Sequence, residues 1–123
     1  MPNPFVHVEL QTRDVAKAKE FYASLFGWKL SDMPMPGGIG NYTLVEVGEG
    51  TGGGMFQNPD PNMPPFWLAY VGVDDVVATT QRAKELGAKV CLDVTNVGDF
   101  GKMSVLQDPQ GASFALWQAL RKM

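Results

Sequence analysis

The sequence has a single cysteine, a single histidine and no long hydrophobic run. One cysteine excludes an intrachain disulfide, and no Cys/His spacing indicates a structural zinc site. No stretch approaches the ~18 apolar residues of a membrane-spanning helix. The N-terminus also lacks the basic and apolar segments of a secretion signal. These absences predict a cytoplasmic protein without a membrane partner.

Positive charge is also scarce. Ten Lys and Arg residues are scattered along a chain of net charge −3 and pI near 5.0. Nucleic-acid binding requires a basic patch or stripe, so nucleic acid is not an expected partner. Hydrophobic residues make up 45% of the 123-residue chain, which is typical of folded proteins, and the length suits one compact domain.

The first half of the chain alternates between strand and helix signals. Val6, Val8 and Leu10 alternate with polar residues, which predicts a half-buried strand over residues 5–12. Asp14 can cap a helix that begins at Val15 and ends before Gly27. Further strands are expected at residues 28–32, 42–47 and 54–57.

The second half repeats this order of elements. Residues 58–65 hold four prolines and predict a stiff connector rather than a strand. After it, Asp75 and Gly87 bound a second helix, as Asp14 and Gly27 bound the first, about sixty residues earlier. Strands are expected at residues 66–73, 89–94, 102–107 and 112–118.

This order predicts an α+β fold of two tandem βαβββ modules. Each module has one helix to cover one face of its sheet, so pairing the two modules would complete burial in a single cup-shaped mixed sheet. We expect one domain over residues 1–123, with module one at about 4–57, the connector at 58–65 and module two at about 66–120.

Three strings of the sequence resemble a known superfamily. The strings are HVELQTRDVAKAKEFYASLFGWKL, LAYVGVDDV and QDPQGASFALW. Their order resembles that of the vicinal oxygen chelate superfamily, which contains glyoxalases, bleomycin-resistance proteins and extradiol dioxygenases. The resemblance implies the glyoxalase/bleomycin-resistance/dioxygenase fold, a homodimer and a small organic molecule bound in the cup.

The resemblance also implies four positions that hold a divalent ion in the metal-dependent members. His7 matches the first, Met55 or a neighbour falls at the second, Leu68 at the third and Ala115 at the fourth. A stable site generally needs three or four protein donors, so no metal and no other cofactor is expected. A non-standard site that combines His7 with Glu9 or Glu46 is the alternative.

Strand alternation indicates which side chains face the cup together with His7. The candidate ligand-binding residues, on this face or in the neighbouring strands and loops, are His7, Gln11, Met55, Leu68, Tyr70, Phe100, Met103, Ser113, Ala115 and Trp117. Phe21, Leu25, Phe114 and Leu116 are expected in the core beneath the helices, and Cys91 is expected to be a buried structural thiol. The alternative interpretation of His7 is a neutral histidine in the pocket that has no catalytic role.

Two classes of function follow. The first is metal-free binding of a small organic molecule in the cup. The second is a lyase or dioxygenase-type enzyme in which His7 acts as base, assisted by Glu9 or Tyr70, or belongs to a non-standard metal site. Glyoxalase I activity is not expected, because the resemblance implies a carboxylate ligand where Ala115 stands.

Overall fold

A computed structural model describes residues 3–34, 41–60 and 62–120 of the chain. It divides into two compact units, His7–Leu68 and a second unit made of Met1–Val6 and Ala69–Met123. The elements, in chain order, are β1 (Phe5–Thr12), α1 (Val15–Phe26), β2 (Lys29–Pro34), β3 (Asn41–Glu46), β4 (Gly53–Gln57), β5 (Phe66–Gly72), α2 (Val76–Glu85), β6 (Lys89–Val97), β7 (Gly101–Gln107) and β8 (Ser113–Ala119). The expected α+β order of two βαβββ modules is confirmed.

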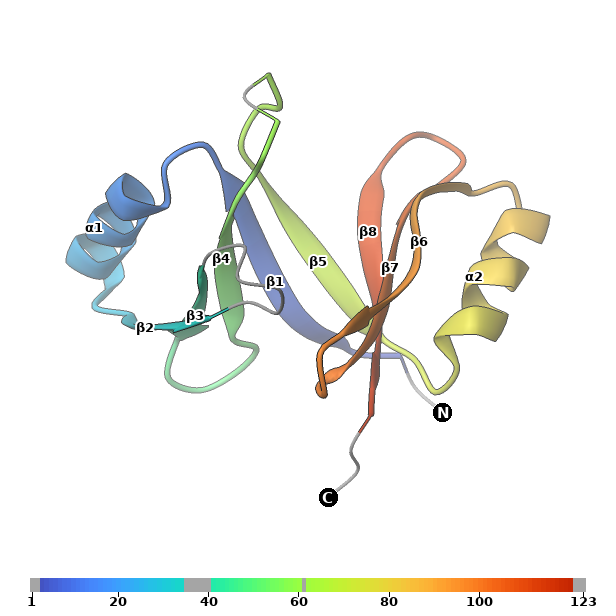
Figure 1. Ribbon diagram of the computed structural model, residues 1–123, viewed down its shortest axis with the longest axis horizontal. Coiled ribbons are helices and arrows are strands. Elements are labelled where there is room, and N and C mark those ends of the chain that lie inside the picture. The colour runs from blue at the N-terminus through green and yellow to red at the C-terminus, as the bar shows by residue number, and fades with distance from the viewer. Residues whose placement is uncertain (1–2, 35–40, 61, 121–123) are drawn as a thin grey trace. The chain divides into compact units, whose positions relative to one another are not determined.

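In the His7–Leu68 unit, the strands run in the order β2-β3-β4-β1. β1 is parallel to β4, whereas β3 is antiparallel to both β2 and β4. Helix α1 lies on one side of these strands (Figure 1). Leu10, Val45 and Met55 form the core on that side, and Val15 and Tyr22 are among the side chains that pack against it.

The Ala69–Met123 unit repeats the arrangement with the order β5-β8-β7-β6. β5 is parallel to β8, and β7 is antiparallel to both β6 and β8. Its core contains Val76, Leu106 and Leu116, the first of them from α2. Beneath α2, the buried hydroxyls of Thr80 and Ser104 are 2.9 Å apart and hydrogen bond to each other.

The repeat is regular at a spacing of 61 residues. Asp14 accepts a hydrogen bond from the backbone N–H of Lys17, and Asp75 accepts one from Ala78, which confirms both predicted N-caps. Gln57 and Gln118, each from the last strand of its module, accept a bond from the first helical N–H, at 3.1 and 2.8 Å. Residues 61 apart therefore occupy equivalent positions in the two modules.

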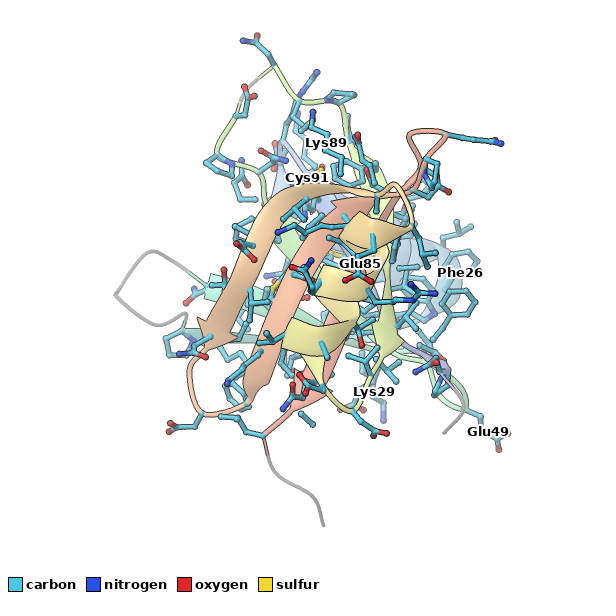
Figure 2. The ribbon with its side chains drawn as sticks, turned by 90° about the vertical axis from the view of Figure 1, so that its right-hand side faces the viewer. Phe26, Lys29, Glu49, Glu85, Lys89 and Cys91 are labelled. Carbon is cyan, nitrogen blue, oxygen red and sulfur yellow. The ribbon has the colours of Figure 1, made fainter. Side chains whose placement is uncertain are left out.

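Several burial predictions are corrected. Cys91, labelled on β6 in Figure 2, is exposed, because it lies on the side of the strand that does not enter the core. Phe21 and Leu25 are also exposed, at 58% and 57%, because α1 reaches its core with other residues of the helix. Leu116 is buried as expected, and Phe114 is half-buried against the same core.

Among the described residues, no helix is long and apolar enough to span a membrane. The module boundary lies at Leu68/Ala69, inside β5 and just beyond the predicted connector, of which residue 61 is not described. Residues 3–6 group with the second module rather than with the first. That the two units form a single domain stays a prediction.

Candidate functional site

A chain of polar side chains lies on the face of β1 that points away from α1. The His7 Nε2 and Tyr42 Oη atoms are 2.7 Å apart, and Tyr42 Oη donates to Glu9 Oε1 at 2.9 Å. Gln11 Nε2 donates to Glu9 Oε2 at 2.8 Å, and Asn58 Nδ2 donates to Gln11 Oε1 at 3.1 Å. We call these five side chains the polar chain, and all of them belong to the His7–Leu68 unit.

Glu9 is the centre of the polar chain. A tyrosine hydroxyl has one hydrogen, and Tyr42 gives it to Glu9, so Tyr42 Oη must accept the hydrogen bond from His7. His7 therefore carries a proton on Nε2. Donors from both ends of the chain point toward one carboxylate, each oxygen accepting from a different side chain. Glu9 is only 6% exposed, so this arrangement satisfies a polar group that would be costly to bury alone.

The local sequence explains how the polar chain forms. His7, Glu9 and Gln11 are two residues apart, so they share one face of β1, while Leu10 enters the core on the other face. Glu9 pairs in register with Gly54 of β4. A side chain on Gly54 would overlap the hydroxyl end of Tyr42, so the glycine provides the space in which the Tyr42 hydroxyl meets Glu9.

The electrostatics favour a neutral imidazole. Burial lowers the pKa of His7 below its usual value near 6.5, because the charged form loses solvation. The negative charge of Glu9 opposes this shift but is the smaller influence. A neutral imidazole at pH 7 can act as a general base or as a hydrogen-bonding partner for a ligand.

Equivalent positions in the second module are mostly apolar. His7, Glu9 and Tyr42 correspond to Leu68, Tyr70 and Met103 at the 61-residue spacing. Tyr70 Oη lies 3.9 Å from Met103 Sδ, the counterpart of the contact between Tyr42 and Glu9. The indole of Trp117 covers Gly101 closely, so that a side chain at Gly101 would overlap it. The two modules share one framework but present different chemistry.

The other predicted site residues are distributed over several environments. Within the Ala69–Met123 unit, five of them lie on one face of the sheet, as expected. This follows from the strand register, which pairs Tyr70 with Ala115 and Met103 with Trp117. Ser113 shares the face because it lies two residues before Ala115 on β8. Leu68 and Ala115 have no exposed surface, whereas Ser113 is exposed. Phe100 lies in the turn between β6 and β7 and is 55% exposed.

The prediction for Met55 is wrong. Met55 pairs with Leu10 across β1 and β4, is fully buried and belongs to the core that α1 covers. Because side chains alternate along a strand, an error of one residue moves the side chain to the opposite face. The second metal position therefore falls on Gly54, 61 residues before Ala115, just as His7 precedes Leu68 by 61.

The residues at the four metal positions do not fit a divalent ion. They are His7, Gly54, Leu68 and Ala115, of which only the histidine carries a donor atom in its side chain. His7 Nε2 also carries the proton that it donates to Tyr42. In the part of the chain that the structure describes, no group of three or more His, Cys, Asp or Glu side chains could hold a metal ion.

Sequence reasoning missed Tyr42, Gly54 and Asn58. The alternation in β3 carried a usable signal, since Thr43 and Val45 are buried and Tyr42 must face the other way. The reach of the Tyr42 ring over Gly54 depends on the register of β3, β4 and β1. Asn58 follows β4 directly and joins the polar chain only because the parallel pairing brings it beside Gln11.

The strand order defines an α+β protein with a repeated βαβββ module, and the sheet of the first module carries the polar chain on the face opposite α1. The family model of the Glyoxalase/Bleomycin resistance protein/Dioxygenase superfamily matches residues 5–116. The chain therefore belongs to this superfamily, as the three sequence strings predicted.

Individual relatives are longer than this chain. It is 43% identical over 117 residues to a Mycobacterium tuberculosis protein named "Putative glyoxylase CFP32", and 31% identical over 128 residues to the anthracycline biosynthesis protein DnrV of Streptomyces peucetius. These matches cover 93% and 89% of this chain but only 45% of each relative. The chain thus spans less than half the length of these curated relatives.

Solved structures confirm the fold. The hypothetical protein BH1468 of Bacillus halodurans C-125 superposes with a TM-score of 0.77 at 14% identity, over 100% of this chain and 99% of that one. Methylmalonyl-CoA epimerase of Mycobacterium tuberculosis gives a TM-score of 0.68 at 15% identity, over 94% and 87% of the two chains. At these identities the likeness concerns the fold alone.

Proposed function

We propose that this protein binds a small organic molecule on the His7 face of its first module, without a metal ion. The observation that carries the proposal is the polar chain itself, in which Tyr42 and Gln11 hold the buried carboxylate of Glu9 from two sides. Such convergent polar groups can orient a ligand, because their positions are set before the ligand arrives.

The names of the relatives suggest a class of ligand. DnrV of Streptomyces peucetius is named for anthracycline biosynthesis, and anthracyclines are flat polycyclic molecules with hydroxyl and carbonyl groups. The polar chain offers both donors and acceptors for such groups. We therefore take a hydroxylated polycyclic aromatic molecule as the first ligand to test.

The experiment is a calorimetric titration with an anthracycline and with smaller hydroxyanthraquinones. We expect saturable binding by the wild-type chain and a decrease in affinity of at least about fivefold, or ~1 kcal/mol, for Tyr42→Phe. Tyr22→Phe is the matched control, because within the described residues no hydrogen bond of the Tyr22 hydroxyl is found, and its ring, which comes from α1, stacks on Trp28 on the other side of the sheet. Equal affinities for the two variants would contradict the assignment of the site.

A metal arm separates metal-free binding from the non-standard metal site. The titration is repeated after treatment with EDTA and again with added Zn²⁺, Ni²⁺ or Mn²⁺. We expect unchanged affinity, since His7 is the sole side-chain donor at the four metal positions. Affinity that depends on one of these ions and is lost in Glu9→Gln would instead support a metal site built on His7 and Glu9.

A second candidate function is proton transfer, with His7 as base. It is supported by the position of the His7 imidazole, which is half-buried and hydrogen bonded to Tyr42 at 2.7 Å, and whose pKa is lowered by burial so that the ring is neutral. Tyr42 would then hold the ring in place and Glu9 would stabilise the protonated ring. Because no metal position other than His7 supplies a side-chain donor, we place glyoxalase I chemistry outside this proposal.

Hydrogen exchange from solvent tests this second candidate. Methylmalonyl-CoA is the probe, because methylmalonyl-CoA epimerases share the fold, and it is incubated with the protein in deuterated water. Deuterium incorporation at its acidic carbon that disappears in His7→Gln would support the enzyme. Equal deuterium incorporation with the wild type and with His7→Gln would reject His7 as the base. In a separate assay with methylglyoxal and glutathione, turnover by the protein would show that glyoxalase I chemistry had been wrongly placed outside the proposal.

Two further assignments belong to the proposal. Cytoplasmic localisation is consistent with one free cysteine, Cys91, exposed on β6, and fractionation of cells that express the chain tests it. A homodimer is the proposed assembly.

A further inference from the structure

The hydrogen-bond donors of the polar chain point toward its centre. His7 gives its Nε2 hydrogen to Tyr42, and Tyr42 gives its hydroxyl hydrogen to Glu9. A neutral imidazole has one N–H and a tyrosine has one O–H, so neither ring has a further hydrogen to donate. The lone pairs that remain on the two rings can only accept hydrogen bonds. The His7 end of the polar chain therefore suits a ligand group that donates them.

The polar chain also has a negative charge and no positive one. Of its five side chains, Glu9 is a carboxylate and none is Lys or Arg. The two side chains that donate to Glu9 are neutral, so they satisfy the carboxylate without cancelling its charge. Glu9 is only 6% exposed, and a buried charge is screened less by salt than an exposed one. This charge acts on a ligand bound at the neighbouring ring of Tyr42.

The rest of this sheet face does not compensate the charge of Glu9. Glu46 lies four residues after Tyr42 on β3 and so shares its face, and strand register places Lys29 of β2 directly opposite Glu46. Two opposite charges in such a cross-strand pair offset each other. Arg13 follows β1, but its Nε donates to the backbone oxygen of Met63 in the connector, at 3.2 Å. Within the described strands of this unit, Glu9 is thus the uncompensated charge of the face.

Charge is also distributed unequally between the modules. Residues 7–68 hold four of the ten Lys and Arg residues but seven of the thirteen Asp and Glu residues. The first module therefore carries the whole net charge of −3, and the rest of the chain is balanced. A negatively charged surface raises the local concentration of cations and repels anions. The field of the module thus has the same sign as that of Glu9.

Apolar side chains lie on the same face, beside the polar chain. Register pairs Met33 with Tyr42 and Leu44 with Gly54, and Phe56 lies two residues after Gly54 on β4. Phe56 and Met33 are half-buried, and Leu44 is 38% exposed. Side chains of this kind can contact the apolar body of an aromatic ligand, while a few polar groups fix its orientation.

We propose that the His7 face selects a ligand that joins a protonated amine to an apolar aromatic body, with the amine at the His7–Tyr42 end of the polar chain. The inference rests on the proposed function and names the charge of its ligand. An ammonium group bonded to Tyr42 Oη would lie roughly 5 Å from the Glu9 carboxylate, within two hydrogen-bond lengths, where opposite charges attract. A carboxylate or phosphate there would meet the charge of Glu9 and the lone pairs of both rings.

The experiment is a calorimetric titration with three derivatives of one hydroxyanthraquinone, which carry an aminomethyl, a carboxamide or a carboxylate group at the same position. At neutral pH the first is a cation, the second is uncharged but has N–H donors, and the third is an anion. We expect the wild type to bind the aminomethyl derivative at least about fivefold more tightly than the carboxamide, and the carboxylate most weakly.

Two variants show whether Glu9 is the source of this preference. Glu9→Gln removes the charge at nearly constant size, and Glu49→Gln removes one charge from an exposed residue between β3 and β4. Glu9→Gln should reduce the preference for the amine to within about twofold, and Glu49→Gln should leave it unchanged. If circular dichroism shows that Glu9→Gln does not fold, a salt series replaces it. Raising NaCl from about 0.05 to about 0.5 M should then reduce the wild-type preference at least about threefold.

Three results would overturn the inference. They are a carboxamide or carboxylate derivative that binds as tightly as the amine, a preference that Glu49→Gln reduces as much as Glu9→Gln does, and a wild-type preference that salt does not change. Equal saturable binding of all three derivatives would reject only the choice of charge and leave the proposed function standing. Failure of all three derivatives to bind would reject both.

Discussion

The hydroxyl of Tyr42 makes two hydrogen bonds in the polar chain, so Tyr42→Phe should destabilise the protein measurably. The variant keeps the ring but loses the 2.7 Å contact with His7 and the 2.9 Å bond to Glu9. A hydrogen bond contributes about 0.5–1.5 kcal/mol, and one to a charged group about 1.5–3 kcal/mol. With Glu9 buried, we expect the free energy of unfolding to fall by about 2–4 kcal/mol.

Urea denaturation followed by tryptophan fluorescence measures this loss, since the chain has three tryptophans. Tyr22→Phe is the control. It removes a hydroxyl from a half-buried tyrosine that keeps its ring contacts with Trp28 and Trp67, and we expect a change below about 0.5 kcal/mol. If Tyr42→Phe were no more destabilising than Tyr22→Phe, the polar chain would not exist in solution as described.

Three further predictions concern the same site. The pKa of His7 is lowered in the folded chain, so the unfolded chain binds a proton first as the pH falls below about 6.5. The free energy of unfolding should therefore decrease below this pH, by at most about 1.4 kcal/mol per pH unit. His7→Gln should abolish this pH dependence. Glu9→Gln removes a charge that raises the pKa of His7, so NMR titration of the single imidazole should give a still lower pKa, and a higher one would refute the sign. Gly54→Ala should displace the Tyr42 hydroxyl and cost about 1–3 kcal/mol in a melt or urea titration; an unchanged stability together with an unchanged His7 resonance would show that the glycine is not required.

The elements of the fold could be predicted because their signals are local. Asp14 and Asp75 cap their helices as expected, since capping depends on residues three positions apart. The strand that contains His7 was predicted at its exact bounds, because alternation over eight residues is a strong period-two pattern. The family followed from the order of three strings, and the family model agrees.

The failures share one cause, since each depended on which face or surface a side chain reaches. Met55 was assigned to the wrong face through an error of one residue in register. Phe21 and Leu25 were expected in the core because they recur at helical spacing, yet a spacing defines a stripe and not the object that covers it. Cys91 was expected to be buried from residue type alone.

The order of residues along the chain was enough to predict the two modules, their helix N-caps and the shared strand face of His7, Glu9 and Gln11, because these depend on neighbours within a few positions. The polar chain was decided only in three dimensions. Register pairs Glu9 with Gly54, and the Tyr42 side chain, coming from a strand more than thirty residues later, enters the space that this glycine leaves. Long-range strand pairing sets which side chains meet, and one sequence read along its length does not specify that pairing.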